Sequence, residues 1–163
     1  MLQFWIVIGV GVGVALAIAA GAFLILRHGK MRENARQQAM DAFASRRAAL
    51  ANEFLAAASA TGKPRGLRWT RCEIGEHALY AVDRGNGELL AMTPVTISFE
   101  AVEGGGMEEV EAVSNLRSAT AVFIHRNGDW TTDGRVVFNL EPEEALQRFA
   151  ESLEPVTPSV PLV

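Results

Sequence analysis

The first part of the chain is an unbroken run of apolar residues. From Phe4 to Leu26 the sequence reads FWIVIGVGVGVALAIAAGAFLIL, without a charged or strongly polar side chain. At 1.5 Å per residue this run makes a helix of about 34 Å, enough to cross a hydrocarbon core of about 30 Å. A lone segment in lipid must satisfy its backbone hydrogen bonds internally, so only a helix fits. The pattern predicts a membrane-spanning anchor over residues 1–27.

The flanks of this run predict how the anchor is retained and oriented. A cleaved signal peptide is the alternative, since Ala20-Gly21-Ala22 loosely fits a cleavage site, but the run is too long and lacks a preceding basic residue. Basic residues follow it instead: Arg27, Lys30, Arg32 and Arg36. This asymmetry places the N-terminus outside, with Phe4 and Trp5 at the outer interface and the C-terminal part in the cytoplasm. We therefore expect a single-pass protein of the cell (inner) membrane, with a basic flank facing the lipid.

Small residues recur at every fourth position of the same run. They are Gly9, Gly13, Ala17 and Gly21. Such a row lets two helix backbones approach closely in lipid, which predicts a homodimer. Because Gly and Ala are common in membrane helices, the row also fits an anchor that stays alone.

Helical spacing continues into a basic connector over residues 28–64. Its segment Met31–Ala60 is rich in good helix formers, contains no Gly or Pro, and ends at Thr61-Gly62-Lys63-Pro64, which is typical of a helix and its stop. One narrow stripe steps by three and four along it: Met40, Phe43, Arg47, Leu50, Phe54 and Ala57. The stripe predicts either a short parallel coiled coil or a helix packed on the protein's own domain.

From residue 65 the pattern changes to an alternation with period two. Apolar and polar residues alternate most clearly over Val95–Ala101, which predicts a half-buried strand. Weaker runs of the same kind are Leu67–Cys72, Ala78–Asp83, Glu108–Val113, Ala119–His125 and Arg135–Leu140. Pairs of Gly, Asn and Asp separate these runs, and such pairs are hairpin signals because they tolerate positive φ.

The last element returns to helical spacing. Pro142 in the first turn, followed by Glu143 and Glu144, is typical of a helix start. One apolar stripe then predicts a helix that lies on the sheet: Ala145, Leu146, Phe149 and Leu153. Residues 155–163 are rich in Pro and are predicted to be a disordered tail.

About six antiparallel strands followed by a helix predict an α+β domain over residues 65–154. The segment TTDGRVVFNLEPEEALQRFAESL, a last hairpin strand that runs into a closing helix, resembles the end of a pleckstrin-homology-like (PH-like) roll. The resemblance implies a bent antiparallel sheet and a phosphoinositide or peptide ligand. Lipid-binding members use a basic first hairpin, whereas Ala81–Glu88 has one Arg and two acids. Cystatin-like and nuclear-transport-factor-like folds, which place a helix before the sheet, are the alternatives.

Charge divides the chain into a basic and an acidic part. Residues 27–71 hold ten Lys or Arg and three acids, a net charge of +7, whereas residues 72–163 hold five Arg and sixteen acids, a net charge of −11. The acidic part has no cluster of basic and aromatic residues, which argues against a nucleic-acid partner.

No constellation of catalytic or metal-ligating residues stands out. His28, His77 and His125 lie far apart and have no Cys or His neighbour at metal-ligand spacing. Cys72 could pair with a His as a nucleophile, but a single Cys on a strand is more typical of a small buried residue. We therefore expect no catalytic residue, no metal and no cofactor.

Three aromatic residues are the candidate recognition residues: Trp69, Tyr80 and Trp130. Aromatic side chains dominate the energetics of protein interfaces. The sequence thus predicts a membrane-anchored protein whose cytoplasmic β-rich domain binds an unknown protein partner or its own copy. A membrane-tethered enzyme is one alternative. A pilin-like or export-apparatus subunit is another, although Gln3-Phe4-Trp5 replaces the Gly cleavage point and early Glu that pilins need.

Overall fold

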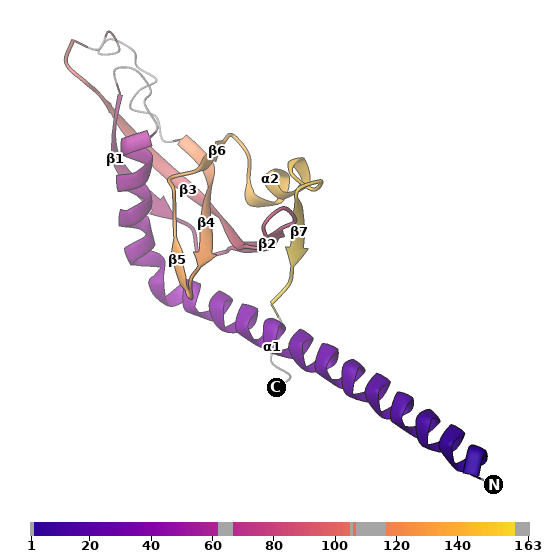
Figure 1. Ribbon diagram of the computed structural model, residues 1–163. Coiled ribbons are helices and arrows are strands. Elements are labelled where there is room, and N and C mark those ends of the chain that lie inside the picture. Colours follow the sequence, from indigo (N-terminus) through magenta and orange to yellow (C-terminus); the bar gives the residue numbers. More distant parts are fainter. Residues whose placement is uncertain (1, 62–66, 105, 107–116, 159–163) are drawn as a thin grey trace. The chain divides into compact units, whose positions relative to one another are not determined.

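The computed structural model describes the backbone of residues 2–61, 67–104, 106 and 117–158, and the side chains of these ranges from residue 18 onward, apart from those of Thr61 and Arg117. Its elements are α1 (Leu2–Thr61), β1 (Leu67–Ile74), β2 (Leu79–Asp83), β3 (Leu89–Ala101), β4 (Arg117–Arg126), β5 (Asp129–Thr131), β6 (Val136–Phe138), α2 (Pro142–Arg148) and β7 (Leu153–Val156), as Figure 1 shows. The predicted α+β class is confirmed, because a long helix is followed by an antiparallel sheet. The chain divides into two units, Met1–Gln38 and Ala39–Val163.

The predicted membrane anchor is contradicted. In the part of the chain that the structure describes, no helix is both long and apolar enough to cross a bilayer. This finding overturns the single-pass anchor over residues 1–27, the location in the cell membrane and the orientation derived from them.

The sheet is built around β3, its longest strand. The strand order is β5-β4-β3-β2-β7, while β1 pairs with β3 and β6 pairs with β4, outside this path. β2 pairs with the beginning of β3, where Leu79 is opposite Met92, and β1 pairs with its end, where Cys72 is opposite Ile97. β5 and β6 likewise pair with opposite ends of β4. Each of the long strands β3 and β4 therefore pairs with two shorter strands, one near each of its ends.

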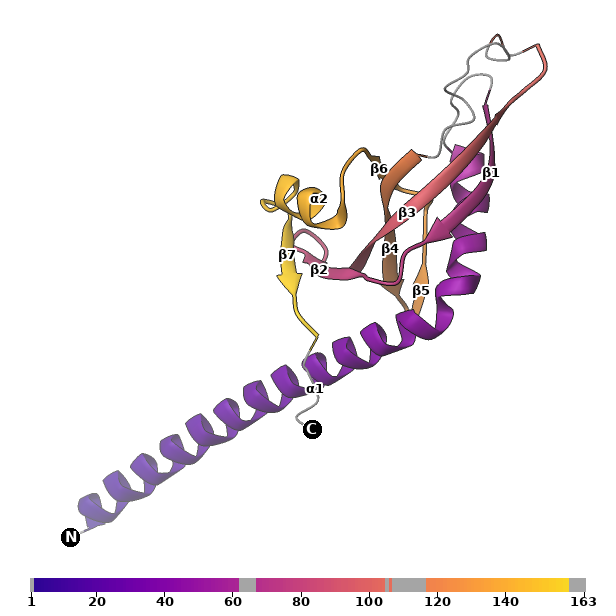
Figure 2. The same cartoon turned by 180° about the vertical axis from the view of Figure 1, so that it is seen from behind.

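Alternating side chains of β3 and β4 supply two separate cores. One core contains the odd-numbered residues, such as Ala91, Ile97 and Phe123, together with residues of α1. The other contains the even-numbered residues, such as Met92 and Val122, together with Ala145 of α2 and Leu153. Figures 1 and 2 show the later part of α1 and α2 on opposite sides of the sheet. The sheet is thus covered by a helix on each face.

The predicted stripe of the connector packs on the protein's own sheet, which was one of its two interpretations. The stripe side chains that are 5% exposed or less are Met40, Phe43, Leu50 and Phe54, joined by Ala39 and Ala58. The ring centroid of Phe43 lies 5.0 Å from that of Trp130 and 5.5 Å from that of Phe123. The polar stripe member, Arg47, donates from Nη2 to the carbonyl of Glu76 at 2.6 Å.

The C-terminal helix is shorter than predicted, and part of the predicted tail is a strand. α2 ends at Arg148, and the backbone N–H groups of Ser152 and Leu153 turn back to the carbonyl of Phe149, each at 2.9 Å. β7 then pairs with β2, with Leu153 opposite Asp83 and Val156 opposite Tyr80. Without β7, the N–H and C=O groups on this side of β2 would have no backbone partner. Because β7 supplies that partner, Pro155 and Val156 form a strand although the Pro-rich sequence predicted a tail without structure.

Two strand predictions differ in other ways. β5 lies where the sequence indicated only a turn, and it forms because Asp129 and Thr131 pair with Arg126 and Ile124 of β4. β3 starts at Leu89 rather than Val95, and it continues through Pro94. The predicted strand Glu108–Val113 lies outside the described residues.

Thr120 is a fully buried polar residue on the α2 side of β4. Its Oγ1 donates to the carbonyl of Leu140 at 2.7 Å, and this bond ties the segment before α2 to the sheet. Thr120→Val keeps the shape but leaves that carbonyl unpaired, so we expect it to lower the free energy of unfolding by about 1–2 kcal/mol. Urea unfolding followed by circular dichroism measures the change. Thr120→Ser keeps the hydroxyl and is the control; equal losses for both variants would show that the hydrogen bond contributes nothing.

Candidate binding groove

Two adjoining cavities lie on the sheet face that is turned away from α1. A cavity of about 290 Å³ is lined by Asp83, Leu90, Met92, Val122, Arg135, Val137, Phe149, Ser152 and Leu153. A second cavity of about 210 Å³ is lined by Asp83, Asn86, Glu88, Leu90, Ile124, Arg126, Thr131, Thr132, Asp133 and Arg135. The two share Asp83, Leu90 and Arg135, so we treat them as one surface and call it the sheet groove.

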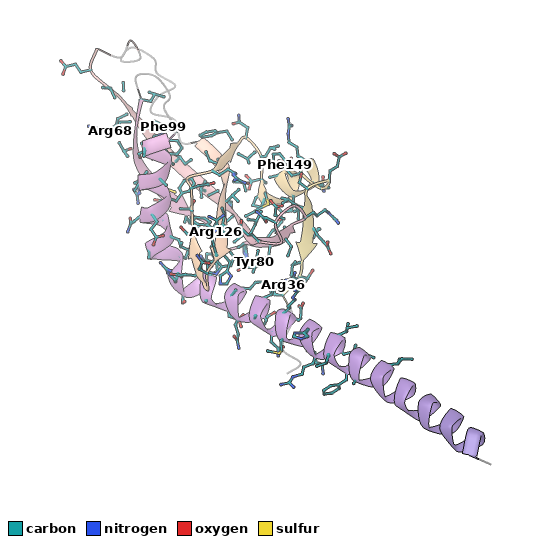
Figure 3. The ribbon with its side chains drawn as sticks, in the orientation of Figure 1. Arg36, Arg68, Tyr80, Phe99, Arg126 and Phe149 are labelled. Carbon is teal, nitrogen blue, oxygen red and sulfur yellow. The ribbon has the colours of Figure 1, made fainter. Side chains whose placement is uncertain are left out.

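The larger cavity is mainly apolar. Met92 and Val122, which are almost fully buried in the second core, form its base. Val137 of β6 and Leu153 of β7 flank this base. Phe149, which follows the last residue of α2, completes the lining and is 40% exposed (Figure 3). The cavity therefore presents apolar surface to solvent beside a largely exposed ring.

The smaller cavity is lined by charged side chains that pair with each other. Arg126 donates from Nε to Oε1 of Glu88 at 2.6 Å and from Nη2 to Oε2 at 3.1 Å. These hydrogen bonds lower the pKa of Glu88 and raise the pKa of Arg126. Arg135 donates from Nη2 to Oδ2 of Asp133 at 3.2 Å. Both Arg side chains of the lining are therefore already partnered by a carboxylate.

Asp83, at the end of β2, holds the turn that borders both cavities. Its Oδ1 accepts the backbone N–H of Gly85 at 2.7 Å and that of Asn86 at 3.4 Å. An Asp in this position stabilises a turn by taking the place of a backbone acceptor. The groove thus carries a third carboxylate that has no Arg of its own in the lining.

The aromatic residues proposed for recognition do not line the groove. Trp69 is 7% exposed and Trp130 is 2% exposed, both in the core between α1 and the sheet. Trp130 donates from Nε1 to the carbonyl of Ala39 at 2.7 Å. The hydroxyl of Tyr80 donates to the backbone carbonyl of Met40 at 3.3 Å. A buried Trp or Tyr commonly finds such a partner for its polar end. These residues attach α1 to the sheet.

The other residues named from the sequence belong to the unit Met1–Gln38, and those whose side chains are described do not line the groove. Phe4, Trp5, Gly9, Gly13 and Ala17 lie outside the described side chains. The described ones are Gly21, Leu26, Arg27, Lys30, Arg32 and Arg36. Leu26 is 71% exposed, and Arg36, labelled in Figure 3, is half-buried. Their predicted roles in dimerisation and lipid contact stay predictions.

Groove residues such as Phe149 and Asp83 were not recognised as site residues from the sequence. The sequence did contain a signal for a second apolar face. On β3 and β4, the residues that alternate with those of the first core are also apolar: Leu90, Met92, Val122 and Ile124. Strands that are apolar on both faces indicate a sheet with a second covered or binding face. Phe149 itself fitted a core stripe equally well.

Two observations on the described residues concern catalytic chemistry. Among them, no group of three or more His, Cys, Asp and Glu side chains could hold a metal ion. Cys72 is half-buried, and burial, with a smaller effect of the Glu73 carboxylate, raises the pKa of its thiol to about 11. A nucleophilic Cys needs the opposite shift, since the thiolate is the reactive form.

The raised pKa predicts slow modification of Cys72. At pH 8 only about one thiol in a thousand is ionised at a pKa near 11, against roughly one in ten at the unperturbed value of 9.0. We expect the native protein to react with a disulfide reagent about 100-fold more slowly than the chain unfolded in urea. The native rate should also rise about tenfold per pH unit up to a pH near 11. Equal rates for the native and unfolded chains would contradict the raised pKa.

No family model matches the chain, and neither the curated proteins nor the solved structures contain a significant match to it. The likeness to a PH-like roll therefore stays a prediction. The function has to be argued from the geometry of the groove.

Proposed function

We propose that the unit Ala39–Val163 is a protein-interaction module that binds a segment of a partner protein in the sheet groove and performs no catalysis. The observation that carries the proposal is that an apolar cavity adjoins a charged one and shares lining residues with it. The exposed ring of Phe149 borders the apolar cavity. Interfaces are commonly built this way, with a buried apolar anchor and a polar surround.

The size of the cavities supports a side chain as the occupant. The two volumes, about 290 and 210 Å³, lie at or below the low end of the range of roughly 300–1,000 Å³ for small-molecule sites. One large apolar side chain can enter the first, and the neighbouring polar backbone or side chains of the same segment can occupy the second.

The order of the elements also supports an alternative fold family. A long helix comes before the sheet, and the seven-residue α2 is followed by another strand, β7. A PH-like roll ends on its closing helix, whereas cystatin-like and nuclear-transport-factor-like folds begin with a helix. We therefore favour one of the latter two. The enzyme and assembly-subunit hypotheses have no comparable observation in their support.

Site-specific photocrosslinking in cells that produce the full chain tests the proposal. A photoreactive phenylalanine analogue is placed at position 149 or, as the matched control, at position 138. Phe138 on β6 is exposed to the same degree, 41% against 40%, but it is not part of the groove lining. We expect discrete protein adducts from position 149 and none of the same size from position 138.

Two results from these variants would contradict the proposed function. Adducts from position 138 alone would place the binding surface elsewhere. The absence of protein adducts from position 149, in a variant whose circular dichroism matches the wild type, would remove the groove as a binding surface.

A further inference from the structure

We infer that the sheet groove selects a basic segment of its protein partner, one in which a bulky apolar side chain is flanked by Lys or Arg. This inference rests on the proposed function, because it names the partner chemistry of the same groove. It follows from the charge that remains around the groove once the internal ion pairs are counted.

The lining itself carries a surplus of negative charge. Its charged members are Asp83, Glu88, Asp133, Arg126 and Arg135. Arg126 is held by Glu88 and Arg135 by Asp133, so neither guanidinium is free to attract an anion without breaking its pair. Asp83 remains as an uncompensated carboxylate at the point where the two cavities meet.

The segment that contributes Phe149, Ser152 and Leu153 increases this surplus. Residues 141–154, which we call the α2–β7 wall, carry the carboxylates of Glu141, Glu143, Glu144, Glu151 and Glu154 but only one Arg, Arg148. Glu154 pairs with Arg84 at 3.4 Å. The wall, the lining and Arg84 together hold eight carboxylates and four guanidinium groups, so these segments carry four net negative charges.

Charge and apolar surface are arranged to act on one segment at the same time. Asp83, the lining carboxylate that no Arg of the lining pairs with, lies in the same surface as Phe149 and Met92. A side chain anchored in the apolar cavity therefore brings its neighbours in sequence to the carboxylates. Lys and Arg neighbours gain attraction there, whereas Asp or Glu neighbours are repelled. Attraction between exposed charges weakens with salt, so binding should be salt-dependent.

A random peptide library displayed on phage is the probe for this inference. The library is selected on the folded full-length protein and counter-selected on the Phe149→Ala variant. We expect the retained sequences to share a large apolar residue flanked by Lys or Arg. Synthetic versions should bind about tenfold or more weakly to Phe149→Ala and about equally well to Phe138→Ala.

A pair of charge variants then isolates the role of the carboxylates. Asp133→Asn with Glu151→Gln removes one carboxylate of the lining and one of the α2–β7 wall, and it keeps an Oδ1 acceptor for the backbone N–H of Arg135. The matched control, Glu73→Gln with Glu100→Gln, removes two charges that pair with Arg71 and Arg68 on β1. We expect the first pair to weaken the selected peptide about three- to tenfold at low salt and the control to have no effect.

The outcomes separate this inference from the proposed function. Sequences that depend on Phe149 but are neutral or acidic would overturn the basic partner and leave the groove as the binding surface. Basic sequences that bind Phe149→Ala as well as wild type would reflect charge elsewhere on the acidic domain, and they would overturn both proposals. A loss of affinity in the Glu73 and Glu100 control equal to that at the groove would also overturn the assignment of the carboxylates.

Discussion

Replacing Gly134 by Ala should lower the free energy of unfolding by about 3–5 kcal/mol, because the new Cβ meets both backbone strain and a backbone collision. Gly134 lies between β5 and β6 with φ of 78°, a left-handed conformation. A Cβ there would lie 2.5 Å from the backbone nitrogen of Ala58 and 2.7 Å from the carbonyl carbon of Ala57. Neither atom can move aside without displacing α1 from the sheet.

Gly128 provides a matched control for this prediction. It also has a positive φ, 85°, but a Cβ added there would have no atom within 4 Å. Gly128→Ala should therefore lose only the conformational part, about 1–2 kcal/mol. Urea unfolding of both variants, followed by circular dichroism, measures the difference. Equal losses would show that α1 does not approach Gly134 as closely as the structure places it.

Phe43→Ala should cause a loss of similar size for a different reason. Phe43 is 1% exposed, and its ring contacts those of Tyr80, Phe123 and Trp130, with centroids 5.0–6.1 Å away. Truncation leaves a cavity among rings that cannot all close in on it, and such substitutions cost about 3–5 kcal/mol. Trp130 fluorescence should shift as well, because its closest ring partner in this cluster disappears.

The control for Phe43 is the exposed ring in the groove. Phe149→Ala removes the same atoms from a side chain that is 40% exposed, so we expect a loss of about 1 kcal/mol or less. The unfolding midpoints in urea compare the two variants under identical conditions. A larger loss for Phe149 than for Phe43 would mean that the sheet is stabilised mainly from the α2 side.

The apolar stripe of α1 shows what local sequence pattern can and cannot predict. Its spacing correctly predicted that Phe43 and Phe54 share one face of a helix, because the period of 3.6 residues is a property of the helix alone. The identity of the opposing surface is not local. Phe123 and Trp130 lie about eighty residues further along the chain, so only the folded structure decides between a coiled coil and the protein's own sheet.

Turns show the same division. Asn127-Gly128 predicted a hairpin from local chemistry, and both residues have positive φ between β4 and β5. Asp133-Gly134 gave the same local signal, yet Gly134 is also required by the approach of the α1 backbone. β7 had no signal at all, since its Pro155 argues against a strand. Pairing with β2 outweighs that preference.

Local sequence pattern was enough to predict the α+β class, the helix of the connector and the hairpins at Gly85-Asn86-Gly87 and Asn127-Gly128, because each depends on residues that are close together in the chain. Other features are visible only in the folded protein. The sheet packs on α1 and buries Trp69 and Trp130. β7 pairs with β2, and Phe149 borders a groove. These features arise from contacts between distant segments. Their energies come from burial and backbone pairing that no single segment contains.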